Sequence, residues 1–285
     1  MMEKILPNVN QTSDAIPKEK LARLSELPSL PALFLEVLQQ INDNQYTTVL
    51  AEKISNDPPL VARILRIANS SFYGRSREIG TVHEAIMLLG VSRVRDLLLA
   101  VCFSKMIPAQ NKNFNYTLFW HHSMAVAECS RQLANHAGIN PELAFTAGLL
   151  HDIGQLIIVV FFPEEANKML TDGKLPSAYE EKHLLGFDHL QMGGQAALYW
   201  KFPLAIQETI EKHEIPPAPD AANSLSSIIY IANLLIQVAE NNQTMVANEF
   251  ENLPAVLNLL PISDEKTALY VDKAQQFADQ IVAIL

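Results

Sequence analysis

Residues 147–154 read Ala-Gly-Leu-Leu-His-Asp-Ile-Gly and place His151 beside Asp152 in the middle of a very apolar segment. A carboxylate in such surroundings needs partners, because burying an unpaired charge is costly. An imidazole nitrogen and a carboxylate oxygen from adjacent residues can also converge on one divalent cation. The segment around the pair, residues 142–162, is apolar on nearly all sides, so we expect it to form a helix in the centre of a bundle.

A second histidine comes from the preceding segment, residues 116–136, which has the periodicity of a long helix. Because its core positions step by three and four residues, His122 points inward and His121 lies about 100° away, nearer solvent. This inward stripe is Phe119, His122, Val126, Cys129 and Leu133. If the two helices pack antiparallel, His122 reaches His151 and Asp152. On spacing alone, the simpler interpretation is a hydrogen-bonded His–Asp pair in the core.

The rest of the chain is also patterned as helices. Of its 285 residues, 49% are hydrophobic and only 10 are glycine, and no segment alternates with a period of two for long enough to indicate a strand. Asp57 followed by Pro58 is typical of a helix start, and Thr81 with Glu84 matches a capping box. The sequence therefore predicts an all-α protein.

Punctuation along the chain predicts how these helices are grouped. Residues 1–20 lack periodicity and are expected to be a loose lead-in, and the polar stretch 108–115 separates two packed helical bundles, residues 21–112 and 116–240. Residues 241–285 are expected to form C-terminal helices. The last helix has apolar positions every three or four residues, which favours docking on the body over binding a partner. These positions are Tyr270, Ala274, Phe277, Ile281 and Leu285.

The charge of the chain bears on its partners. It carries 21 Lys and Arg against 31 Asp and Glu, a net charge of -10, which disfavours an electrostatic grip on nucleic acid. Residues 53–112 are locally basic, and their arginines are most simply interpreted as a solvated face: Arg63, Arg66, Arg75, Arg77, Arg93 and Arg95. The N-terminus has no signal-peptide pattern and the longest apolar run, residues 156–162, is too short to cross a bilayer. We therefore expect a cytoplasmic protein without membrane contact.

A series of motifs in fixed order covers roughly residues 21–235. They are residues 27–31 (LPSLP), 56–60 (NDPPL), 67–74 (IANSSFYG), 85–90 (AIMLLG), 120–123 (WHHS), 148–154 (GLLHDIG), 186–189 (GFDH), 199–203 (YWKFP) and His213. This series resembles the HDOD branch of the HD superfamily of metal-dependent phosphohydrolases, the HD-related output domain of bacterial signalling proteins. The resemblance implies that residues 21–240 form one HDOD domain, whose second half is HD-like.

The resemblance also implies a site and exposes its departures. It implies a metal ligand set of His122, His151, Asp152 and a later residue, where the superfamily has Asp after Ala and this chain has Asn233. A neutral amide in that place weakens the binding of a divalent ion, so we expect a degenerate metal site and no catalytic residues. The related HD-GYP phosphodiesterases have Lys where this chain has Gln155.

Three later histidines do not reproduce the HD-GYP spacing. These are His183, His189 and His213. We interpret His189 as a residue that caps or pins a helix start, and His213 as one that interacts with a helix dipole when protonated.

The resemblance implies a signalling output or interaction module that works through a partner protein in trans or a small phosphate-bearing ligand. No cofactor is assigned beyond a divalent ion (Mn, Mg, Fe, Ni or Zn) at partial or no occupancy. The alternative is a metal-dependent phosphohydrolase acting on a nucleotide or cyclic dinucleotide. A third and weaker alternative is nucleic-acid binding through the basic stretch, which the total charge disfavours.

Overall fold

Helices form nearly all the regular structure in the computed structural model, which describes residues 16–39, 47–69, 79–106, 111–218, 224–240, 260 and 262–283. Within these ranges there is no strand, and the β-type pairing is a single isolated bridge between Thr171 and Lys174. The prediction of an all-α protein is confirmed. Several expected features lie outside the described residues: most of the lead-in, the motif residues 70–74, Arg75 and Arg77, and the chain at 241–259.

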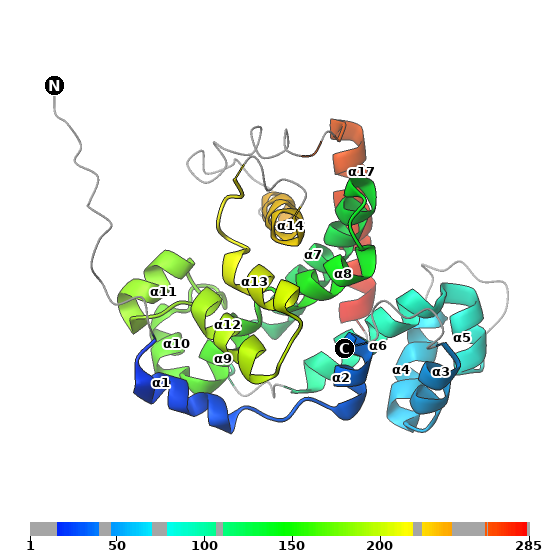
Figure 1. Ribbon diagram of the computed structural model, residues 1–285, viewed down its shortest axis with the longest axis horizontal. Coiled ribbons are helices and arrows are strands. Elements are labelled where there is room, and N and C mark those ends of the chain that lie inside the picture. Colours follow the sequence, from blue (N-terminus) through cyan, green and yellow to red (C-terminus); the bar gives the residue numbers. More distant parts are fainter. Residues whose placement is uncertain are drawn as a thin grey trace.

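The N-terminal helices form one end of an elongated molecule (Figure 1). In chain order they are α2 (Ala32–Gln39), α3 (Thr47–Ser55), α4 (Pro58–Ala68), α5 (Val82–Leu89) and α6 (Val91–Met106). The predicted caps are present: the Asp57 side chain accepts from Leu60 N, and Thr81 and Glu84 form the capping box. Because these caps satisfy free backbone N–H groups, they define where α4 and α5 begin.

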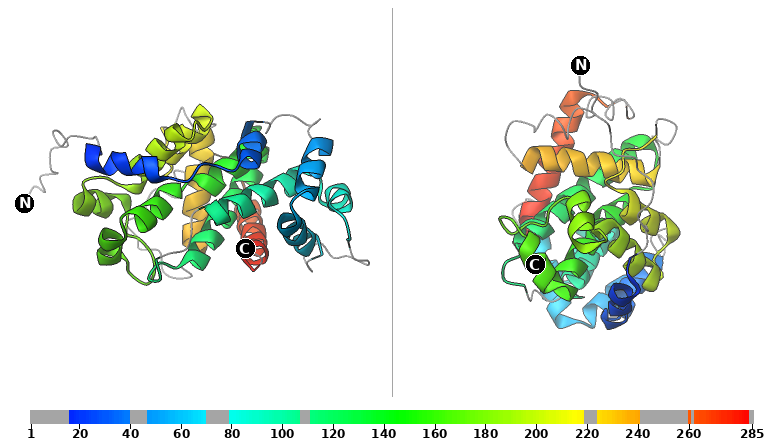
Figure 2. Two further views of the ribbon diagram at one scale, coloured as in Figure 1. Left: turned by 90° about the horizontal axis from the view of Figure 1, so that it is seen from below. Right: turned by 90° about the vertical axis from the view of Figure 1, so that its left-hand side faces the viewer.

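The first ordered residues do not belong to this end of the molecule. Helix α1 (Lys18–Ala22) and the 3-10 turn η1 (Arg23–Glu26) lie at the opposite end, so the helix begins inside the segment expected to be loose. Lys20 Nζ is 2.7 Å from Glu165 Oε1, and Trp200 Nε1 donates to Pro28 O at 3.1 Å. These contacts hold the N-terminal segment along the HD-like half, as the left-hand view of Figure 2 also shows.

The second half of the chain forms the other end of the molecule. Its helices are α7 (Tyr116–Ala137), α8 (Pro141–Leu150), α9 (Ile153–Phe161), α10 (Pro163–Met169), α11 (Ala178–Leu185), α12 (His189–Tyr199), α13 (Leu204–Lys212) and α14 (Leu225–Glu240). A short turn at Gly138, which has a left-handed φ of 73°, lets α8 pack back along α7. This antiparallel pair brings the start of α7 next to the end of α8.

The apolar segment 142–162 is two helices, and the expectation of a single helix is wrong. Helix α8 ends at Leu150 and α9 begins at Ile153, because the backbone at Asp152 leaves the helical range (φ −96°, ψ 16°). The break redirects the chain so that Gly154 packs directly on α12, where an added Cβ would lie 1.9 Å from the His189 carbonyl oxygen. An all-round apolar pattern contains no signal for such a break, since both helices are buried.

Taken together, residues 141–161 have the length and mean hydropathy of a membrane-spanning helix. The longest uninterrupted apolar run within them is nevertheless short. In the stretch Pro141–Phe161, 83% of the most apolar window is buried inside the protein. Burial of this extent is the property of a core segment, and α8 and α9 are packed by α7, α12 and α14.

A buried ionic network joins α6 of the N-terminal half to α7 and α8. Its ion pairs are Arg93–Glu128, Arg95–Glu142, Arg131–Asp96 and Arg131–Glu142. The interpretation of Arg93 and Arg95 as part of a solvated face is therefore wrong. Positions of charge in a sequence do not reveal that a second half of the molecule will cover them.

The last helix, α17 (Asp264–Val282), docks along α7 as expected. Phe277 meets Phe145 edge-on with ring centroids 6.0 Å apart, and the guanidinium of Arg93 lies over the Phe277 ring. The right-hand view of Figure 2 shows α17 crossing the side of the bundle near α14. The apolar stripe of α17 is thus used for packing within the chain.

Candidate metal centre

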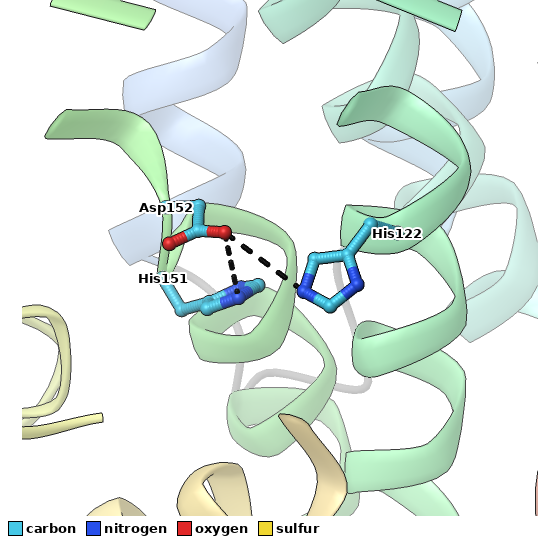
Figure 3. A group of neighbouring side chains, drawn as sticks. All are labelled: His122, His151 and Asp152. Atoms are coloured by element: carbon cyan, nitrogen blue, oxygen red, sulfur yellow. Dashed lines mark ion pairs between the residues drawn. The ribbon is translucent and has the colours of Figure 1, made fainter. Parts of the chain in front are cut away.

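The break between α8 and α9 carries the central residues of the site. Figure 3 shows Asp152 pointing towards both His151 and His122, the latter from α7. Oδ2 of Asp152 lies 3.2 Å from His151 Nε2 and 3.9 Å from His122 Nε2. On α14, Asn233 faces the same point, with Oδ1 3.0 Å from His122 Nε2. The structure thus brings together all four residues of the expected ligand set.

Two histidines that the sequence analysis did not assign to the site complete the surroundings of Asp152. The other carboxylate oxygen, Oδ1, lies 3.1 Å from His213 Nε2 and 3.6 Å from His189 Nε2. The helix start is capped by Asp188, which accepts from Gln191 N, so His189 is free to point inward. Four imidazoles therefore surround one carboxylate.

A sequence signal for these two residues did exist. Both belong to the ordered series of motifs, and Gly154 and Gly193 are small residues where α9 and α12 meet. Their local context, however, only places each at the end of its own helix. That the two helix ends meet at Asp152 is a tertiary fact.

Backbone carbonyls fix the orientation of two of the imidazoles. His151 Nδ1 is 2.7 Å from Gly148 O, and His213 Nδ1 is 2.9 Å from Ile210 O. Because a carbonyl only accepts, each Nδ1 carries the proton. Nε2 of each ring then faces Asp152.

Carboxylates fix the orientation of the other two imidazoles, again by accepting a hydrogen bond from Nδ1. His189 Nδ1 donates to Glu181 Oε2 at 2.7 Å, and His122 Nδ1 donates to Glu240 Oε2 at 3.0 Å. Each of the four rings thus has its Nδ1 held by an acceptor and its Nε2 facing the centre. This second-layer arrangement is typical of histidines that ligate metal through Nε2.

The arrangement leaves buried polar atoms without hydrogen bonds. Among the described residues, these include the Nε2 atoms of His151, His189 and His213 and Oδ1 of Asp152. Buried polar groups are ordinarily satisfied by hydrogen bonds. A cation among these atoms would satisfy all of them, so the residues present fit a divalent metal ion. Imidazole-rich sets suit Zn, Fe or Ni better than Mg.

The electrostatics of the cluster keep Asp152 ionised. Burial alone would raise the pKa of Asp152, but the imidazoles of His151 and His213 outweigh it and hold that pKa well below its ordinary value. Burial lowers the pKa of His151. The opposite holds for His189, because Glu181 and Glu214 outweigh burial and hold its pKa well above the ordinary value. Protons and a divalent cation would therefore compete for the Nε2 side of the cluster.

The cluster opens into a cavity of about 740 Å³. Its wall includes His122, Asp152, Asn233 and Gln155. Among the described residues that line it, Lys174 is the only lysine or arginine, against the carboxylates of Asp152, Glu214 and Glu240. An anion entering this cavity would thus meet a wall that is more acidic than basic, unless a cation is bound.

Solved structures provide comparisons for the whole fold. A protein from Shewanella amazonensis SB2B, described as a "Putative phosphohydrolase", is 30% identical with a TM-score of 0.71, and the match covers 92% of this chain and 97% of that one. An HDOD domain protein of unknown function from Geobacter sulfurreducens has a TM-score of 0.73 at 24% identity, covering 93% and 97%.

Among curated proteins, an uncharacterized protein of Treponema pallidum is 24% identical over 253 residues, or 86% of this chain. The present chain spans about half the length of that relative, 48%. The sequence model of the HDOD domain family matches residues 27–216, which contain His122, His151, Asp152, His189 and His213. The chain therefore belongs to the HDOD domain family.

Proposed function

We propose that this protein is a signalling output module whose Asp152-centred cluster binds a divalent transition-metal ion and does not turn over phosphoesters. The observation that carries the proposal is the common orientation of the four imidazoles, each held at Nδ1 and facing Asp152 through Nε2. A His–Asp pair that served only packing would need neither four rings nor a common orientation.

The ligands divide between the two oxygens of Asp152. On the Oδ2 side, His122, His151 and Asn233 would hold an ion, and on the Oδ1 side His189 and His213 would do so. A bound ion of this kind supplies a Lewis acid that attracts an anionic ligand into the cavity. The residues of this chain orient the imidazoles, keep Asp152 ionised and shape the space for the ligand.

Charge argues for binding without turnover. Asn233 contributes a neutral oxygen where a carboxylate would neutralise the ion, and Gln155 puts an amide in the cavity wall where a lysine would hold a phosphate. The ligand set expected from the sequence has a single negative charge, that of Asp152, which neutralises only half of the charge of a divalent ion. Three further carboxylates, Glu181, Glu214 and Glu240, reach the histidines and reduce that deficit. We therefore propose firmer metal binding than the sequence alone suggests.

The wider role stays within the same proposal. A cavity of about 740 Å³ that contains a metal ion suits a small phosphate-bearing ligand. A partner protein would then bind differently to the ligand-bound and ligand-free forms. We place this activity in the cytoplasm, in line with the two unpaired cysteines among the described residues.

Metal content tests the proposal. Protein purified without chelator, and apoprotein titrated with Zn²⁺ by calorimetry, should both give about one equivalent of metal per chain, bound beside Asp152. Asp152→Asn should abolish binding because it removes the shared anionic ligand. His183→Gln, on an exposed histidine of α11, is the matched control and should bind normally. Equal binding by Asp152→Asn and wild type would refute the proposal.

The alternative of a metal-dependent phosphohydrolase is favoured by one observation, the opening of the cluster into the cavity. Turnover of nucleoside phosphates and cyclic dinucleotides with Mn²⁺, Mg²⁺ or Ni²⁺ separates the two functions. We expect no turnover. Hydrolysis by the wild type that is lost in His151→Ala would establish the enzyme instead.

A further inference from the structure

Glu240 occupies an unusual position, at the last residue of α14 and outside residues 27–216. Its two carboxylate oxygens face two adjacent histidines of α7. Oε2 accepts from His122 Nδ1 at 3.0 Å, and Oε1 lies 3.6 Å from His121 Nδ1. His121 continues outward, with Nε2 3.1 Å from Asp279 Oδ1 on α17. A continuous row of polar contacts thus runs from the C-terminal helix to the metal centre.

We propose that Glu240 is the positioning residue for His122, and that through His121 it couples metal binding to the docking of α17. The proposal rests on the proposed function, because it requires that the cluster binds an ion. It adds that residues beyond the HDOD match control how well the cluster does so.

His122 needs such a residue more than the other histidines do. The side chains of His151, His189 and His213 are at most 1% exposed, so their surroundings fix their rings. The side chain of His122 is 14% exposed and lines the cavity. Without an acceptor at Nδ1, its ring is free to turn or to place its proton on Nε2, where it would block a metal ion.

Helix α14 supplies both the ligand and its support. Asn233 and Glu240 are seven residues, or two turns, apart and therefore lie on one face of α14. One contacts His122 at Nε2 and the other at Nδ1. A rotation or partial unwinding of α14 would therefore release both contacts together.

The link to α17 follows from the same contacts. Asp279 holds His121, and His121 in turn holds the second oxygen of Glu240. If docked α17 favours the arrangement of Glu240 that binds metal, bound metal must favour docked α17 to the same extent. A change in metal binding should therefore change how firmly α17 is docked, and the reverse should also hold.

Zn²⁺ titration of the full chain tests the positioning role. Glu240→Ala should weaken Zn²⁺ binding about 10- to 100-fold, the loss typical of outer partners of metal ligands. Glu240→Gln keeps one acceptor oxygen and should recover part of that loss. Unchanged affinity in both variants, with metal-binding wild type, would overturn the inference and leave the proposed function intact.

A metal-free measurement makes the two failures distinguishable. Nitrogen-15 NMR of the apoprotein should find the His122 proton on Nδ1 in wild type and redistributed towards Nε2 in Glu240→Ala. A purely structural role for Glu240 would not move this signature. If the wild type binds no Zn²⁺, the proposed function fails, and the inference falls with it; an unaltered His122 signature in Glu240→Ala contradicts the inference alone.

Two alanine variants of α17, one at the contact with His121 and one away from it, test the coupling. Asp279→Ala and Asp272→Ala each remove one exposed carboxylate from the same face of α17, but Asp272 lies two turns before Asp279 and its side chain accepts from Gln276. We expect Asp279→Ala to weaken Zn²⁺ binding by up to about fivefold, the range of an exposed ion pair, and Asp272→Ala to leave it unchanged. Hydrogen exchange in α17 should slow severalfold on adding Zn²⁺ in wild type and not in Asp279→Ala. Identical behaviour of the two variants would refute the coupling.

Discussion

Nε2 of His213 lies 3.1 Å from Oδ1 of Asp152, whose other oxygen, Oδ2, lies 3.2 Å from His151 Nε2. The ring centroids of the two histidines are 4.8 Å apart and their planes are perpendicular, so both rings present Nε2 to one carboxylate from different helices. This relationship makes Asp152 a bridge between two groups of ligands. It also places His213 in the cluster that we propose to bind metal.

Replacing His213 should therefore weaken metal binding. His213→Gln removes an imidazole nitrogen next to Asp152, and we expect Zn²⁺ affinity measured by calorimetry to fall at least about tenfold. His183→Gln makes the same change at an exposed position of α11 and should have no effect. Equal affinities of the two variants would remove His213 from the site.

Gly154→Ala should destabilise the protein. The added Cβ would lie 1.9 Å from the His189 carbonyl oxygen and 2.9 Å from Gly193 N, so α9 and α12 would have to separate. We expect the free energy of unfolding, measured in urea, to fall by about 1–3 kcal/mol. Zn²⁺ binding should weaken in parallel, because His189 is carried by α12.

Gly80→Ala is the control, since the nearest atom to its added Cβ is the Glu84 carboxylate at 3.8 Å. A loss of stability as large as that of Gly154→Ala would show that the close approach of α9 and α12 is unimportant.

The sequence predicts much of this architecture and part of the site. Caps at Asp57 and Thr81 are local, so the sequence shows them directly, and the periodicity of α7 places His122 inward because a core stripe has one phase. Asp152 follows from the His–Asp pair in an apolar segment, and Asn233 from the resemblance to the HD superfamily. The break at Asp152, the burial of Arg93 and the role of His189 depend on which helices meet, and no local pattern encodes that.

Asp96 should make the stability depend on pH. Burial is the main cause that raises its pKa to about 7, with Glu142 adding to it and Arg131 opposing it. Because the unfolded value is about 3.8, the folded state holds the extra proton between these pH values, and stability falls as pH rises from about 4 to 7. Above pH 7 this contribution is constant.

The measurement compares urea unfolding of wild type and Asp96→Asn from pH 5 to 8. Asn stays neutral, so the difference between the two free energies of unfolding should change by up to about 1.4 kcal/mol per pH unit below pH 7 and level off above it. A difference that does not vary with pH would contradict the raised pKa.

Asn233→Asp should strengthen metal binding. The substitution places a carboxylate where the Asn233 Oδ1 now lies 3.0 Å from His122 Nε2, the position at which the resemblance to HD phosphohydrolases implies an anionic ligand. We expect Mn²⁺ affinity to rise about tenfold. Gln237→Glu adds the same charge to the same helix and cavity wall one turn from Asn233, and it should have a smaller effect, because among the described residues the polar contacts of His122 are with Asn233, Glu240 and Asp152. An equal effect of both changes would mean that only the general negative charge matters.

The most direct test of the account is a crystal structure of the Zn²⁺-bound protein with anomalous diffraction at the zinc edge. We predict an anomalous peak beside Asp152, about 2.0–2.2 Å from its carboxylate oxygen and from Nε2 of at least two of the four histidines. Anomalous peaks that occur only elsewhere on the protein, with the four imidazoles and Asp152 joined by hydrogen bonds alone, would contradict it.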